Sequence, residues 1–149
     1  MKTFMVTAIL TLSITFNAVA VSADQSLIDL KKAETIITAL PDMYKYQSLD
    51  KENDPVLKQQ DKAFKILEEA VKAYLESPED QLLLAEILKI ASASNKKDPW
   101  VYASEIVSPI AVKQRARFEK ALKTLPSSEA SNLQKSIQNA IRENSKGNG

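Results

Sequence analysis

Residues 98–109 read DPWVYASEIVSP, and this stretch places six apolar side chains between two prolines, among them Trp100, the only tryptophan of the chain. The opening Asp-Pro pair predicts a helix start, because proline is favoured at the first helical position and aspartate caps the free N–H groups. Pro109 predicts the helix end, since proline disfavours helical geometry in the residue before it. A helix that is apolar nearly all round, Tyr102 included, is expected to be buried. We therefore expect 99–107 to form a buried central helix.

The rest of the chain also predicts helices. No glycine follows residue 24 until Gly147, and apolar residues recur every three or four positions, as in Leu30, Ala33 and Ile37. Three more Asp-Pro or Ser-Pro pairs mark further helix starts. The predicted fold class is all-α, a compact bundle of five to six short helices. The expected helices lie near 25–40, 55–76, 78–94, 99–107, 109–124 and 127–144.

The N-terminal segment 1–23, MKTFMVTAILTLSITFNAVAVSA, is typical of a secretory signal peptide. Lys2 precedes an apolar run, and the small residues that follow fit cleavage after Ala23, or alternatively after Ala20. An uncleaved membrane anchor is the other interpretation, weakened by the Thr, Ser and Asn residues within the run. We expect 24–149 to be a single helical domain located in the periplasm or secreted.

The composition excludes several kinds of chemistry. The chain has neither histidine nor cysteine, so Ser-His-Asp triads, Cys-His dyads and histidine or thiolate zinc sites are not available to it. Phosphate-binding loops need glycine, which the body of the chain lacks. We therefore expect a protein that is not an enzyme and has no catalytic residue, no metal site and no cofactor.

One enzymatic alternative remains open. Glycan can be cleaved by a pair of carboxyl groups, one protonated and one ionised, and an exported protein could meet glycan in the cell wall. The acids that could be partly buried are Glu105, Glu34 and Glu86. Solvent exposure of Glu105 at a polar helix edge is the simpler interpretation.

The segment KQRARFEKALK, 113–123, is strongly basic. Lys113, Arg117 and Lys120 share one face at helical spacing, and such a face attracts an acidic protein or an anionic membrane surface. A solvated helix face is the simpler reading. Nucleic acid is not an expected partner, because the chain is predicted to be exported and its charges balance once the signal segment is removed.

The connection PDMYKYQSLDKEND, 41–54, is long for a link between two helices, and long loops often carry function. Met43, Tyr44 and Tyr46 are side chains of the kind enriched at protein interfaces. The alternative is that the two tyrosines cover the end of the bundle.

These observations favour an exported, non-enzymatic module that binds another protein through Met43, Tyr44 and Tyr46 or through the basic face. An inhibitor or immunity-type protein that neutralises a secreted toxin or hydrolase fits the size, the predicted address and the missing catalytic groups. The alternatives are an envelope chaperone or adaptor, an anionic membrane-surface binder, and the carboxylate-based wall glycosidase.

Overall fold

The computed structural model describes residues 22–43, 54–96 and 102–146. This part of the chain forms six helices and no strand, which confirms the all-α bundle. The helices are α1 (Ala23–Met43), α2 (Pro55–Glu76), α3 (Gln81–Asn95), α4 (Tyr102–Lys113), α5 (Arg115–Leu122) and α6 (Ser127–Lys146).

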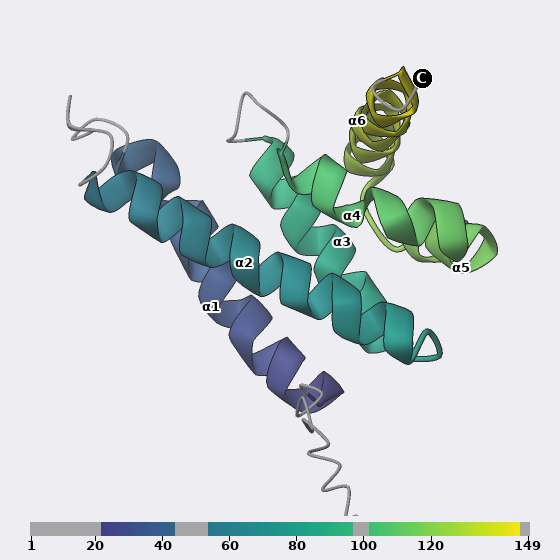
Figure 1. The fold of residues 1–149 in the computed structure, drawn as a ribbon, viewed down its shortest axis with the longest axis horizontal. Helices are drawn as coiled ribbons and strands as arrows, with labels where there is room; N and C mark the ends of the chain where they lie inside the picture. Colours follow the sequence, from purple (N-terminus) through teal and green to yellow (C-terminus); the bar gives the residue numbers. More distant parts are fainter. Residues whose placement is uncertain (1–21, 44–53, 97–101, 147–149) are drawn as a thin grey trace, which may run out of the picture.

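The helices surround α3, which contacts each of the other five. The long helices α1 and α2 lie side by side, whereas α6 stands at the other end of the molecule against α3 and α4 (Figure 1). One apolar core cluster has members from all six helices, and the predicted stripe Leu30, Ala33 and Ile37 is fully buried in it. None of the helices in the described ranges has the length and apolar character needed to cross a membrane.

The start of α2 follows the predicted capping chemistry. The carboxylate of Asp54 accepts a hydrogen bond of 2.7 Å from the backbone N–H of Val56, and Pro55 occupies the first helical position. The expected bounds of this helix, 55–76, are therefore confirmed.

The predicted start of the next helix at residue 78 is wrong. Asp80 caps α3, because its carboxylate accepts a 2.9 Å hydrogen bond from the N–H of Leu83. Ser77 instead closes α2, and its N–H donates to the carbonyls of Ala73 and Tyr74. The Ser-Pro pair thus lies in the turn between two helices, and Asp80 caps the second of them.

Pro109 does not end a helix as predicted, because it lies inside α4. Proline cannot donate to the carbonyl four residues earlier, here that of Glu105. The hydroxyl of Ser108 donates to that carbonyl at 2.8 Å instead and satisfies it. The side chain before the proline therefore lets the helix continue to Lys113.

Helix α4 contacts α2, α3, α5 and α6, which gives it an interior position in the bundle. It buries one side, including Ala103, Val107 and Ile110, whereas Tyr102 is 43 % exposed and meets Phe64 edge to face with ring centroids 5.1 Å apart. The expected burial of Tyr102 is therefore wrong. Trp100 lies outside the described residues.

Candidate functional site

The basic face predicted on 113–123 is divided into two parts. Gln114 leaves helical geometry, with φ −130° and ψ 42°, so the single helix expected at 109–124 is instead α4 followed by α5. Lys113 ends α4 and lines a hollow between α2 and α4. Arg117 and Lys120 lie together on α5 and line a different pocket.

That second pocket lies between α3 and α5 and has a volume of about 530 Å³. We call it the α3–α5 pocket. Its walls are mostly apolar, with Leu84 and Ala85 from α3 and Ala121 from α5. Tyr74, near the end of α2, also lines the pocket. The pocket therefore combines an apolar interior with two cationic side chains.

Leu82 lines the same pocket and is 75 % exposed, more than any other large apolar residue described. The run of three leucines at 82–84 begins directly after the cap of α3. Consecutive helical residues point about 100° apart, so they cannot all face the core. Leu83 and Leu84 are buried, and Leu82 is left outside.

Arg117 is held in place by the turn between α2 and α3. Its guanidinium donates a 2.8 Å hydrogen bond to the carbonyl of Pro78 and forms a longer ion pair of 3.4 Å with Glu79. Lys120, almost one turn later, has no hydrogen bond or ion pair to any residue in the described ranges. One cation is therefore positioned, and the other is available to a partner.

Tyr74 is fully buried, and its hydroxyl has no hydrogen-bond partner among the described residues. Burial raises the pKa of this phenol above its usual value; the positive charge of Arg117 opposes the shift, and Asp80 adds to it. The hydroxyl therefore stays protonated and keeps an unused donor. The apolar spacing of Phe64, Leu67, Val71 and Tyr74 in the sequence predicts only that Tyr74 belongs to the core stripe of α2. Whether its hydroxyl has a partner depends on neighbours from other helices.

Of the acids considered for glycan cleavage, Glu34 and Glu86 meet around one lysine, and Glu105 lies apart from them. Glu34 and Glu86 both pair with Lys89, at 2.9 and 3.4 Å. These contacts, the hydrogen bond from Lys89 to Glu34 above all, raise the pKa of the lysine against the opposing effect of burial. Glu105 is exposed and lies beside Lys113 in the α2–α4 hollow. Within the described ranges no group of three acidic residues could hold a metal ion.

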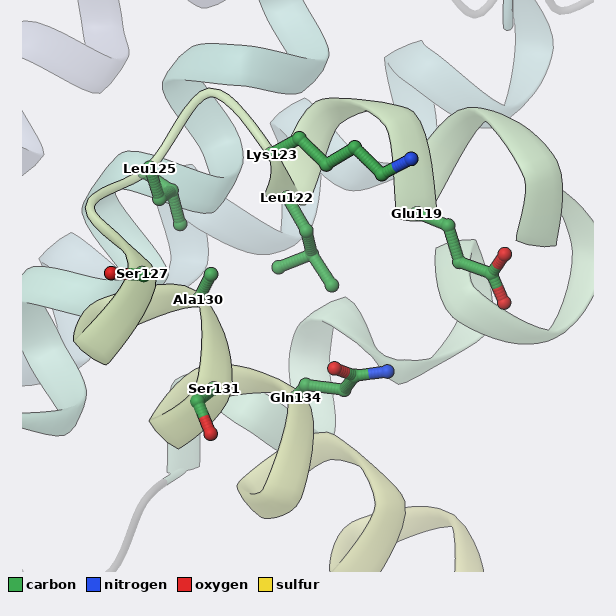
Figure 2. Close-up of a pocket in the computed structure, with 8 residues that line it drawn as sticks. All are labelled: Glu119, Leu122, Lys123, Leu125, Ser127, Ala130, Ser131 and Gln134. Carbon is green, nitrogen blue, oxygen red and sulfur yellow. The ribbon is translucent and has the colours of Figure 1, made fainter.

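A further hollow of about 570 Å³ lies between α5 and α6. In Figure 2, Leu122 points from α5 toward Ala130 on α6, and Lys123 and Glu119 extend along the α5 side. Glu119 is already paired with Arg115 at 2.8 Å. None of the residues that line this hollow has a buried polar side-chain atom that lacks a hydrogen-bond partner. The hollow differs in this respect from the α3–α5 pocket, where the Tyr74 hydroxyl is such an atom.

The other predicted interface residues lie at or beyond the end of α1. Met43 is the last residue of that helix, so the connection begins later than residue 41. Tyr44 and Tyr46 lie outside the described residues.

Comparisons with protein-family models, with curated proteins and with solved structures found no significant match to this chain. The class that the fold defines is an all-α helical bundle. The site is a surface pocket with apolar walls and a cationic rim.

Proposed function

We propose that this chain is an exported, non-enzymatic protein-binding module, an inhibitor or immunity-type protein that neutralises a secreted toxin or hydrolase. The observation that carries the proposal is the surface formed by Leu82, Arg117 and Lys120, which we call the Leu82 surface. An exposed leucine and two cationic side chains line the same pocket there.

This composition suits recognition of an acidic protein. Protein interfaces commonly place an apolar anchor at the centre, and arginine is enriched among the residues that dominate binding energy. The hydrogen bond to Pro78 already restrains Arg117, so less side-chain entropy is lost when a partner binds. The unpaired Lys120 adds attraction that speeds association with a negatively charged surface.

The choice of an inhibitor over other binding modules comes from the sequence. The signal-like segment indicates export, and the lack of histidine and cysteine removes the commonest catalytic groups. A membrane-surface role is the weaker alternative, because the break at Gln114 places Lys113 at a different hollow from Arg117 and Lys120.

Co-purification from a periplasmic extract tests the proposal. The tagged chain should capture one stoichiometric partner, and Leu82→Asp should abolish the capture by removing the apolar anchor and adding repulsion toward an acidic surface. Ile28→Asp is the matched control, because Ile28 is 54 % exposed on α1 and does not line the pocket. This control should capture the partner like the unaltered chain.

Three other outcomes of these experiments would contradict the proposal. A spread of unfolded proteins in place of one partner would indicate a chaperone. Capture that survives Leu82→Asp unchanged would refute the Leu82 surface as the docking site. Salt-sensitive sedimentation with anionic vesicles, without a protein partner, would favour the membrane-surface alternative.

A further inference from the structure

The α3–α5 pocket has the dimensions of a small-molecule site beneath the Leu82 surface. Its volume of about 530 Å³ falls within the range of roughly 300–1,000 Å³ that small ligands occupy. The walls contributed by Leu84, Ala85 and Ala121 are apolar, so they favour a hydrocarbon group over a polar one. A protein contact at the rim does not account for this interior.

The hydroxyl of Tyr74 requires its own explanation. Buried polar groups in proteins nearly always have a partner, and an unsatisfied one destabilises the fold. This hydroxyl is buried without a partner in the described part of the chain, although the residue lines a pocket. The hydroxyl is covered in the ligand-free structure, so a ligand that satisfies it must displace the side chains over it and supply a hydrogen-bond acceptor.

The charges near that hydroxyl indicate the kind of acceptor. Tyr74 and Arg117 both line the pocket, and the positive charge of Arg117 lowers the pKa of the Tyr74 phenol against the larger effect of burial. Lys120 adds a second positive charge on the same helix. Two acids are close to these groups: Asp80 accepts the N–H of Leu83 as the cap of α3, and Glu79, which is 85 % exposed, forms the 3.4 Å ion pair with Arg117. An anionic acceptor fits these groups best.

We propose that the α3–α5 pocket binds an aliphatic carboxylate, whose carboxylate accepts hydrogen bonds from Tyr74 and Arg117 while its chain lies against Leu82 and Ala121. Lys120 contributes long-range attraction to the same head group. The site goes beyond the proposed function, because it needs no protein partner. It can therefore be tested with small molecules even if no toxin or hydrolase is found.

Isothermal titration calorimetry of the purified chain tests the ligand class directly. Decanoate, kept below its micelle concentration, should give saturable binding to one site. Each CH₂ group added between octanoate and decanoate should raise the affinity by up to about fourfold, the value for full burial of a methylene. Decylamine, with the same chain and the opposite charge, should not bind at the same concentrations.

Two substitutions test the site. Tyr74→Phe removes only the hydroxyl and should weaken decanoate binding about tenfold or more, as expected for a hydrogen bond to a charged group. Arg117→Gln should do the same, and Ala85→Leu should block the chain by filling the pocket. Tyr102→Phe and Arg115→Gln are matched controls outside the pocket and should leave binding unchanged.

Three results would overturn the inference. The first is no saturable heat with decanoate, and the second is equal binding of decylamine. The third is an unchanged affinity for decanoate in both Tyr74→Phe and Arg117→Gln, after circular dichroism has shown that both variants are folded. Because Tyr74 is buried, Tyr74→Phe leaves the Leu82 surface intact, and protein capture by this variant should persist. Failure of the ligand site is therefore distinguishable from failure of the proposed function.

Discussion

Tyr74→Phe should stabilise the ligand-free protein, although it removes a polar group from a core tyrosine. In most proteins this change deletes a hydrogen bond and costs about 1 kcal/mol. Here the hydroxyl is buried with no partner in the described structure, so folding includes its desolvation without compensation. Removing an unsatisfied buried group recovers about 1–3 kcal/mol, and the aromatic ring stays in place. We expect the free energy of unfolding to rise by about 1–2 kcal/mol.

Urea unfolding followed by far-UV circular dichroism measures this change. The midpoint should rise while the dependence on urea stays constant, because the exposed area on unfolding is nearly unchanged. Thermal unfolding should shift upward by about 4 °C per kcal/mol for a domain of this size. Val112→Ala, at an exposed position of α4, should change stability by less than about 0.5 kcal/mol. A Tyr74→Phe protein destabilised by about 1 kcal/mol would show that the hydroxyl has a partner, which refutes the reasoning.

Three other predictions concern the helices. Ser108→Ala should destabilise the protein by about 1 kcal/mol in urea unfolding, because the carbonyl of Glu105 loses the hydrogen bond from the Ser108 hydroxyl. An unchanged stability would mean that water supplies this hydrogen bond in the variant. The hydrogen bonds from Lys96, chiefly, and from Ser92 lower the pKa of Glu129 below its ordinary value of 4.5. The contact between α6 and α3 should therefore contribute fully to stability above that ordinary value, and its contribution should be lost as the pH falls from there through the lower pKa of the folded chain. Glu129→Gln should remove that dependence from pH-resolved unfolding, and an identical profile in the variant would contradict this. The hydroxyl of Ser22 accepts a hydrogen bond from the N–H of Gln25 near the start of α1. In thermal unfolding, a chain that begins at residue 21 should therefore be about 1 kcal/mol more stable than one that begins at residue 24. Equal stabilities would exclude a capping role for Ser22.

Local chemistry accounts for the helices that were predicted with the right bounds. Asp54 caps α2 through its own side chain two residues away, a contact that needs no other part of the fold. A polar residue followed by proline was misleading at Ser77 and Pro78. Ser77 and Asp80 lie three residues apart, and either side chain can cap a helix there. The structure uses Asp80, since Ser77 closes the preceding helix.

The candidate site was only partly predictable. Arg117 and Lys120 were identified from their charge and spacing, and they do line one pocket. Lys113 was grouped with them only because the sequence shows no sign of the break at Gln114. Leu82 had a detectable signal in the run of three leucines, which a helix cannot bury on one side. Tyr74 had none, because an unpaired hydroxyl is a property of its surroundings.

The sequence by itself determined the secondary-structure class, since apolar spacing of three and four, sparse glycine and Asp-Pro starts act over a single helical turn. The same spacing located core residues such as Leu30, Ala33 and Ile37, whereas only the tertiary structure decided the exceptions. The continuation of α4 through Pro109, the exposure of Leu82 and the unpaired hydroxyl of Tyr74 are observed only in the folded bundle. The physical reason is that burial and hydrogen-bond satisfaction depend on groups far apart in the chain, which the packing of α2, α3 and α5 brings together.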